Sequence, residues 1–145
     1  MTNKVTREIL FGVLLGNASL QTYTGGKTWR IRFAQGNLNK KYLFHLYDVF
    51  KKYVNTPPKQ VLNGTWTFNT TVSLVGLKFS KFFYSRFGGK YKKVMPSKET
   101  LNKYLTPIAL SYWFMDNGSL KSNSQSYYLH TDCFELDELK VLREV

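Results

Sequence analysis

The order of apolar and polar positions predicts helices that alternate with short strands buried on one side. Residues 6–17 are apolar along one helix face and also beside it, at Phe11 and Leu15, so we expect this helix to be covered on more than one side. Residues 38–54 carry one apolar stripe with lysines opposite it, which is typical of a helix that packs on a core. Further helices are predicted over residues 77–87, 97–104, 106–116 and 135–145.

Segments between these helices in which apolar and polar residues alternate predict strands with one apolar and one polar face. Residues 19–23 and 29–33 flank a turn that contains Gly25 and Gly26, which supply the positive φ angles of a tight hairpin. In the second strand, Arg30 and Arg32 lie opposite the apolar residues. The strand predicted over residues 65–74 also has a polar face, which holds Thr65, Thr67 and Asn69. That face can contact base edges and phosphates, or it is an ordinary solvated surface.

Charge favours a polyanionic partner over a membrane. The chain holds 21 lysines and arginines against 9 acidic residues, for a formal net charge of +12. Five of the nine acids lie in residues 132–145, so the rest of the chain is still more basic. Lysine and arginine neutralise phosphates and supply most sequence-independent affinity for nucleic acids. No apolar run reaches the roughly 18–20 residues that cross a bilayer, and we expect no membrane partner.

Two segments, 100 residues apart, match each other position for position. They are LFGVLLGNAS over residues 10–19 and LSYWFMDNGS over residues 110–119. Both resemble the LAGLIDADG helix and the serine after it, and the second is very close to the form LAYWFMDDG. The intervening segments YLFHLYDVF and FSKFFYSRFGG also look like the single-chain organellar members. The sequence therefore resembles the LAGLIDADG homing endonuclease family over essentially its whole length.

The resemblance implies an α+β fold, in which an αββαββα repeat presents an antiparallel saddle-shaped sheet to the DNA major groove. Residues 1–105 would form the first repeat, and residues 106–145 the beginning of a second, incomplete repeat packed on the first. The two motif helices would meet along a seam of small residues: Gly12, Gly16, Ala109 and Gly118. The residues expected to bind nucleic acid are Lys27, Arg30, Arg32, Thr65, Thr67, Asn69, Lys90, Lys92, Lys93 and Lys121.

Asparagine stands at both positions where the family keeps its metal-binding aspartates. By the resemblance, the catalytic positions are Asn17 and Asn117, and active members hold Mg²⁺ there. An amide keeps the shape of a carboxylate but loses its charge, and Mg²⁺ prefers carboxylate oxygens and waters. We therefore expect no metal or other cofactor as the chain stands, with Asp116 as a weak candidate ligand. We expect metal-dependent cleavage to be abolished.

Three functional hypotheses follow from the resemblance. The leading one is a cleavage-incompetent nucleic-acid-binding protein, recruited as a structural component of an organellar RNA–protein assembly. A second is an intron-encoded, Mg²⁺-dependent double-strand DNA endonuclease that was inactivated on purpose by Asp→Asn changes. A third is an RNA maturase of the same family. In each case we expect duplex DNA or structured RNA as partner, a second chain that supplies the missing half or a larger ribonucleoprotein, and a mitochondrial or other organellar location.

Overall fold

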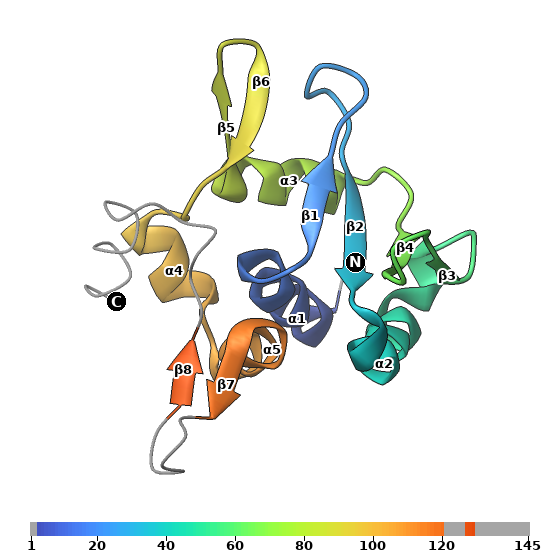
Figure 1. The fold of residues 1–145 in the computed structure, drawn as a ribbon. Helices are drawn as coiled ribbons and strands as arrows, with labels where there is room; N and C mark the ends of the chain where they lie inside the picture. Colours follow the sequence, from blue (N-terminus) through green and yellow to red (C-terminus); the bar gives the residue numbers. More distant parts are fainter. Residues whose placement is uncertain (1–2, 121–126, 130–145) are drawn as a thin grey trace.

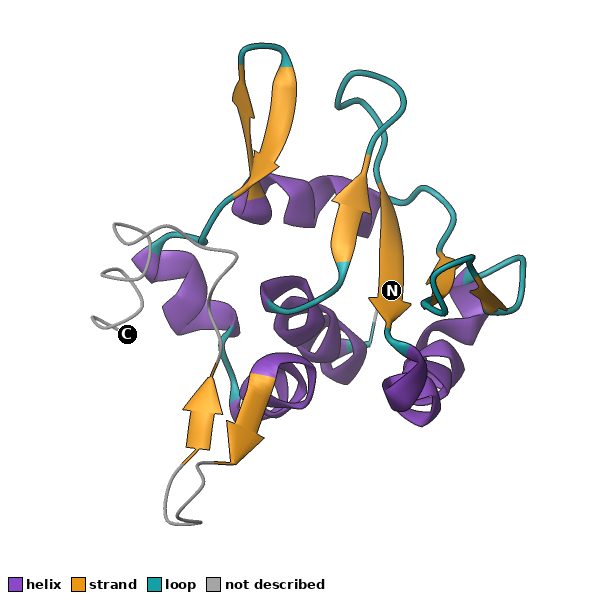
Figure 2. Ribbon diagram, in the orientation of Figure 1, coloured by secondary structure: helices purple, strands orange, loops and turns teal. Residues whose placement is uncertain are grey.

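The computed structural model describes residues 3–120 and 127–129 (Figures 1 and 2). Its helices are α1 (Lys4–Leu15), α2 (Lys40–Phe50), α3 (Leu74–Phe83), α4 (Lys98–Tyr104) and α5 (Pro107–Asn117). Its strands are β1 (Ser19–Gln21), β2 (Arg30–Gln35), β3 (Lys59–Gln60), β4 (Trp66–Asn69), β5 (Tyr84–Phe87), β6 (Lys90–Lys93), β7 (Gly118–Leu120) and β8 (Tyr127–Leu129). Lys121 and the helix predicted over residues 135–145 lie outside the described residues.

A four-stranded antiparallel sheet forms the centre of the fold. The strand order is β1-β2-β4-β3, and β2 pairs with β1 on one side and with β4 on the other. On one face, Ile31 and Phe33 of β2 are buried, and Phe33 stacks on Phe68 of β4 with ring centroids 4.5 Å apart. The helices α1, α2 and α3 contribute buried residues to the same core. The α+β class and the antiparallel sheet are therefore confirmed.

Helix α1 is buried over its last seven residues because it has neighbours on two sides. Helix α5 lies along one side, in the most extensive helix–helix contact among the described residues (Figure 1). On another side, the ring of Phe11 packs between Phe83, at 5.1 Å, and Tyr104, at 5.5 Å between centroids. The broad apolar surface of residues 6–17 thus serves two packing partners, as its sequence pattern predicts.

The absence of a side chain at Gly12 sets how closely α1 and α5 approach. A Cβ atom built at Gly12 would lie 2.9 Å from the carbonyl carbon of Ala109 and closer still to its oxygen. Real Cβ atoms essentially never approach backbone so closely. Ala109 is itself fully buried, so neither helix can yield without opening the core. The Oγ1 of Thr106 accepts from the Ala109 N–H at 3.2 Å and begins α5 as predicted.

Two sequence predictions in the middle of the chain were wrong. The strand predicted to Leu74 ends at Asn69, because the Ser73 hydroxyl accepts from the Gly76 N–H and starts α3. The helix predicted to Phe87 ends at Phe83, and residues 84–87 pair with residues 90–93 as the β5–β6 hairpin. The Gly88-Gly89 pair has φ angles of +54° and +83°, so it forms a hairpin turn rather than a helix end. The short strand β3 was not predicted.

Within the described part of the chain, we find no helix with both the length and the apolar content that a bilayer crossing requires.

We predict that Gly12→Ala destabilises the fold by about 1–3 kcal/mol, the usual cost of forcing a methyl group into a packed contact. The measurement is urea unfolding followed by tryptophan fluorescence. Gly36→Ala is the matched control, because its Cβ would meet no atom within 4 Å and its φ of −62° suits alanine. Equal stability of the two variants would contradict the tight α1–α5 contact.

Candidate functional site

The C-terminal ends of α1 and α5 are joined by a polar network around Asp116. The backbone N–H of Asn17, just past α1, donates to Oδ2 of Asp116 at 3.0 Å. Nε2 of Gln35, the last residue of β2, donates to Oδ1 of Asp116 at 2.9 Å. The Asn17 amide donates in turn to Oε1 of Gln35 at 3.4 Å. The Asp116 carboxylate thus joins the end of α1, the end of β2 and its own helix, α5. We call Asn17, Gln35 and Asp116 the seam network.

The side chain of Asp116 is largely buried, which is unusual for a carboxylate. Burial raises its pKa from 3.8 to about 6, against the opposing effect of its hydrogen bonds from Asn17, Tyr42 and Gln35 and of the nearby Lys93 charge. Tyr42 of α2 lies beside it, and burial together with the Asp116 charge raises the Tyr42 pKa well above its usual value. The Tyr42 hydroxyl is therefore a hydrogen-bond donor to Asp116 throughout the physiological range.

Lys93 supports the segment that carries Asn17. Its ammonium donates to the carbonyl oxygens of Gly16, at 3.0 Å, and Ala18, at 2.9 Å. Lys93 was expected in a basic loop facing nucleic acid; instead it lies in β6 and its charge is directed at the turn between α1 and β1. Its contribution is to hold that turn, since the two carbonyls on either side of Asn17 share one cation.

The groups at this position do not fit a Mg²⁺ centre of the kind the resemblance implies. The two oxygens of Asp116 already accept hydrogen bonds from Asn17, Gln35 and Tyr42, which leaves little capacity for a hard cation. Asn17 offers an uncharged amide, and the residue at position 117 is also an asparagine. Over residues 3–120 and 127–129, no three His, Cys, Asp or Glu residues are grouped as metal ligands.

The sheet face opposite the core gathers polar side chains from three strands. Arg32, in the middle of β2, lies opposite Ser19 of β1 and Asn69 of β4. Next along the strand, Arg30 is held by Gln21, which accepts from Nε at 3.0 Å, and by Tyr23, whose hydroxyl accepts from an Nη at 3.0 Å. We call this surface, formed by β1, β2 and β4, the open sheet face.

Asn69 on the open sheet face has an unusual environment. Its Oδ1 is buried and has no hydrogen-bond partner. Asn69 and Arg30 also line a cavity of about 410 Å³ together with Tyr23 and the loop from Thr70 to Val72. An unpaired acceptor beside arginines is suited to a ligand that brings its own donors, because a buried acceptor left alone costs about 1–3 kcal/mol.

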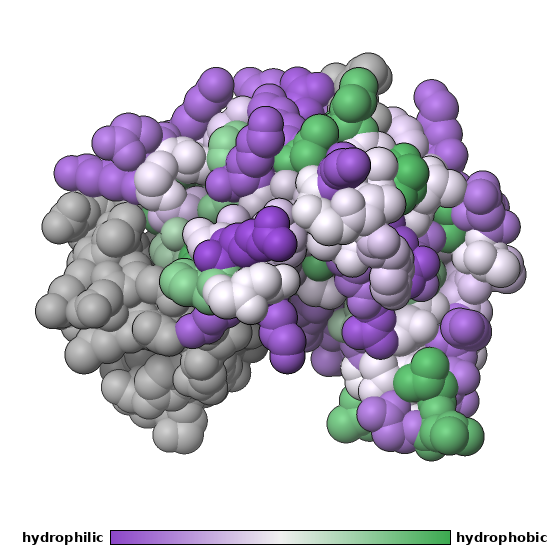
Figure 3. Space-filling model, turned by 90° about the horizontal axis from the view of Figure 1, so that it is seen from above, coloured by the Kyte–Doolittle hydropathy of each residue, from purple (hydrophilic) through white to green (hydrophobic). Residues whose placement is uncertain are grey.

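The other residues predicted to bind nucleic acid are placed less uniformly. Thr67 is only 3 % exposed, so its side chain does not face solvent as expected. Thr65, just before β4, is half-buried, and Lys27 is exposed in the turn between β1 and β2. Lys90 and Lys92 are exposed on β6, in a separate two-stranded hairpin. The end of the molecule that carries the β1–β2 turn and the β5–β6 hairpin is largely hydrophilic, with small separate hydrophobic patches (Figure 3).

The predicted seam residues are brought together only in part. Gly12 lies against Ala109, while Gly16 caps the end of α1 and Gly118 begins β7. Asn117 ends α5, and its side chain lies outside what is described. The sequence analysis missed Gln35 and Tyr42. The only signal for Gln35 was its position, because it continues the apolar series of Ile31 and Phe33 on β2 with a polar side chain.

The pH dependence of stability should reveal the buried carboxylate. The folded pKa of Asp116 lies above its unfolded value, so the native state holds the proton more tightly, and stability falls as pH rises from about 4 to about 6. The cost at neutral pH is up to about 3 kcal/mol. We predict that the stability of Asp116→Asn relative to wild type rises between pH 4 and pH 7, measured by urea unfolding. Asp48→Asn, at an exposed carboxylate, is the control, and an equal change in both variants would contradict this account.

Comparisons with known proteins agree with this geometry. In the solved structure of the homing endonuclease I-WcaI bound to its DNA recognition sequence, the matching fold has a TM-score of 0.78 at 27% identity, covering 97% of this chain and 65% of that one. The DNA endonuclease I-ChuI of Chlamydomonas applanata is 31% identical over 88% of this chain and 65% of its own length. The cytochrome b mRNA maturase bI2 of Debaryomyces hansenii is 32% identical over 97% of this chain and 55% of its own length.

The chain thus spans about 55–65% of the length of these relatives. A family model described as the LAGLIDADG DNA endonuclease family matches residues 7–145, which include most of α1, all of α5 and the whole central sheet. With the tight α1–α5 contact, the antiparallel sheet and this match together, the chain belongs to the LAGLIDADG DNA endonuclease family.

Proposed function

We propose that this chain binds nucleic acid through its open sheet face and does not cleave it. The observation that carries the proposal is the seam network, in which the carboxylate of Asp116 is used to join α1, β2 and α5. The position that bears the metal-binding acid in active relatives is an asparagine, and its backbone N–H is a donor to Asp116. The same groups that would organise catalysis therefore organise the fold instead.

Binding is supported by the charge and shape of the open sheet face. Arg30 and Arg32 extend from one strand with Asn69 opposite, and arginine and asparagine are the side chains that make paired hydrogen bonds to guanine and adenine edges. Arg30 is already oriented by Gln21 and Tyr23, so little side-chain entropy would be lost on contact. The chain's net charge of +12 adds sequence-independent attraction to phosphates.

A cleavage step is disfavoured by charge. Two-metal hydrolysis needs anionic ligands that hold cations over the scissile phosphate, and positions 17 and 117 provide neutral amides. Asp116 does not replace them, because it is a single carboxylate and both of its oxygens already accept hydrogen bonds, from Asn17 and Gln35. A phosphate that approaches the C-terminal end of α1 would meet the uncharged side chain of Asn17, which does not hold a cation for it.

Structured RNA is the second candidate target, favoured by the relatives that are cytochrome b mRNA maturases. We propose an organellar location on the same ground, and a role within an RNA–protein assembly in which another polypeptide segment supplies a second sheet. The choice between targets is measured by fluorescence anisotropy with a DNA duplex and a structured RNA of equal charge at one salt concentration. Tighter binding of the RNA would support the assembly role, and tighter binding of the duplex the endonuclease ancestry.

We predict that Arg32→Gln weakens binding of a DNA duplex by about 1–3 kcal/mol and lowers the slope of log affinity against log salt if the side chain contacts phosphate. Anisotropy titrations at several salt concentrations measure both quantities. Lys81→Gln removes one exposed charge from α3, which packs on the core side of the sheet, and should leave binding nearly unchanged. Equal losses of DNA affinity in the two variants would contradict a specific role of the open sheet face, because any exposed positive charge would then contribute as much.

Restoring both acids should restore a metal site. In Asn17→Asp/Asn117→Asp, one new carboxylate is on the residue whose backbone N–H donates to Asp116 and the other is on the residue that follows Asp116 in the chain. We therefore predict a lower melting temperature without Mg²⁺ and a recovery when Mg²⁺ is added. Wild type should show no such recovery. Duplex DNA should be cut by the double variant only, when a second half is supplied. A double variant that neither gains stability from Mg²⁺ nor cuts DNA would refute the view that the two amides are what abolishes the metal chemistry.

A further inference from the structure

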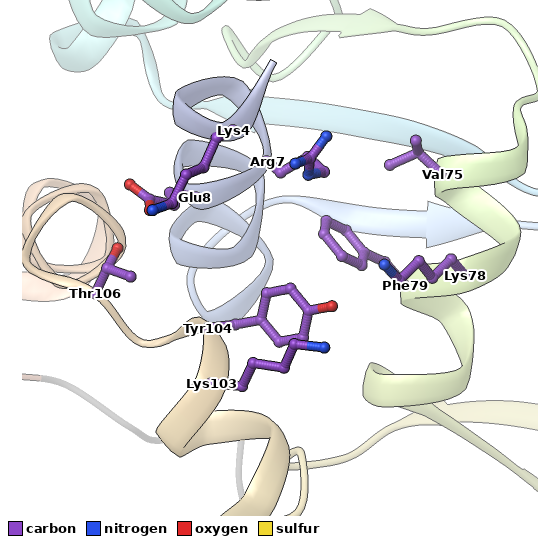
Figure 4. Close-up of a pocket in the computed structure, with 9 residues that line it drawn as sticks. All are labelled: Lys4, Arg7, Glu8, Val75, Lys78, Phe79, Lys103, Tyr104 and Thr106. Atoms are coloured by element: carbon purple, nitrogen blue, oxygen red, sulfur yellow. The ribbon is translucent and has the colours of Figure 1, made fainter. Parts of the chain in front are cut away.

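A cavity of about 530 Å³ opens between the beginning of α1, helix α3 and the end of α4. Figure 4 shows side chains from these elements turned toward a common space. Its lining residues are Lys4, Arg7, Glu8, Val75, Lys78, Phe79, Lys103, Tyr104 and Thr106; we call it the α1–α3–α4 pocket. Its volume lies within the range of roughly 300–1,000 Å³ that is typical of small-molecule sites.

The pocket concentrates positive charge from three elements. Four of its lining residues are cationic and one, Glu8, is acidic. Lys78 from α3 and Lys103 from α4 converge on one ring, with their Nζ atoms 5.7 Å and 5.3 Å from the centroid of Tyr104. Two ammonium groups held near each other repel, and an anion between them would relieve that repulsion.

The phenol of Tyr104 reports the same field. Burial raises its pKa, but hydrogen bonding to Lys78 and the charges of Lys78 and Lys103 outweigh that effect, so the pKa of Tyr104 lies below its usual value of 10.0. The ring itself is fixed, because it stacks on Phe11 at an interplanar angle of 21° and meets Phe79 edge to face. The base of the pocket is therefore a packed aromatic ring beside two exposed lysines.

The pocket lies at the end of α1 remote from the seam network. Lys4, Arg7 and Glu8 belong to the first two turns of α1, whereas Asn17 follows its last turn. A helix of 12 residues is about 18 Å long at 1.5 Å per residue. A ligand in the pocket can therefore bind while the open sheet face and the seam network are occupied by another molecule.

We propose that the α1–α3–α4 pocket binds the phosphate group of a nucleotide. Lys78 and Lys103 would meet the phosphate oxygens as point charges, and the Tyr104 hydroxyl would donate to them. The half-buried Val75 and the edge of Tyr104 offer apolar surface to the base or sugar. The carboxylate of Glu8 can accept from sugar hydroxyls, as Lys and Arg cannot. The phosphate comes either from a free nucleotide or from a nucleotide within an RNA chain, and the proposal stands independently of the proposed function.

The first test is isothermal titration calorimetry of the whole chain with adenosine triphosphate and with a 5′-phosphorylated RNA hairpin. The pocket variant is Lys78→Gln/Lys103→Gln. Its matched control is Lys40→Gln/Lys51→Gln, which also removes two exposed lysines that lie over aromatic rings, but outside the pocket. We expect the pocket variant to lose about tenfold or more in affinity, because it removes two charged hydrogen-bond donors to the phosphate. The control should change less than about twofold for adenosine triphosphate.

The second test observes Tyr104 directly, by NMR titration of a chain labelled with ¹³C at the tyrosine Cζ and assigned with Tyr104→Phe. A bound phosphate would neutralise the lysine field, so the pKa of Tyr104 should move upward when adenosine triphosphate or inorganic phosphate is added. Selective loss of adenosine triphosphate binding assigns the site to free nucleotides, and selective loss of hairpin binding assigns it to RNA. Equal affinities of the pocket and control variants for every probe, or no binding of any probe, would overturn the proposal.

Discussion

The close approach of α1 and α5 at Gly12 and Ala109 is the constraint on which the rest of the structure depends. Because no side chain separates the two backbones there, the helix ends meet closely enough for Asp116 to accept from the Asn17 N–H. The same packing leaves the other side of α1 for the aromatic residues around Phe11. One glycine thus fixes the polar end of the seam and, through α1, the aromatic core beside it.

The seam network joins the C-terminal ends of α1 and α5 to the end of β2. Gln35 is buried at the end of β2 and joins Asn17 to Asp116. These hydrogen bonds fix the position of this strand end relative to the ends of α1 and α5. Lys93 holds the intervening turn from the far hairpin. Burying one carboxylate with several donors is less costly than burying several carboxylates together, which would need a bound cation to offset their repulsion. Asparagine at positions 17 and 117 is consistent with a seam that is stable without metal.

Much of this arrangement could be predicted from the sequence, and the failures have identifiable causes. The periodicity of residues 38–54 and the start signal at Thr106-Pro107 each predict a helix, and the structure has α2 (Lys40–Phe50), flanked by 3₁₀ turns, and α5 (Pro107–Asn117) there. The segment from Tyr84 to Phe87 was assigned to a helix because its aromatics continue the spacing of α3; the pairing with β6 decided otherwise. Thr67 lies on the polar side of the alternating pattern, yet its side chain is buried. Roles that depend on tertiary contacts, such as those of Gln35 and Lys93, leave almost no mark in a linear pattern.

The two ends of α1 divide the surface into regions with different chemistry. At one end, the open sheet face and the seam network combine arginines with neutral amides; at the other, the α1–α3–α4 pocket gathers cations around a fixed phenol. The central claim concerns the first region: it binds nucleic acid without metal. The most direct measurement is the affinity of the unaltered chain for a DNA duplex in EDTA and in Mg²⁺, with the strands then separated on a denaturing gel. We predict saturable binding of similar strength in both buffers and intact strands. Binding that requires Mg²⁺, or strands cut in its presence, would contradict the account.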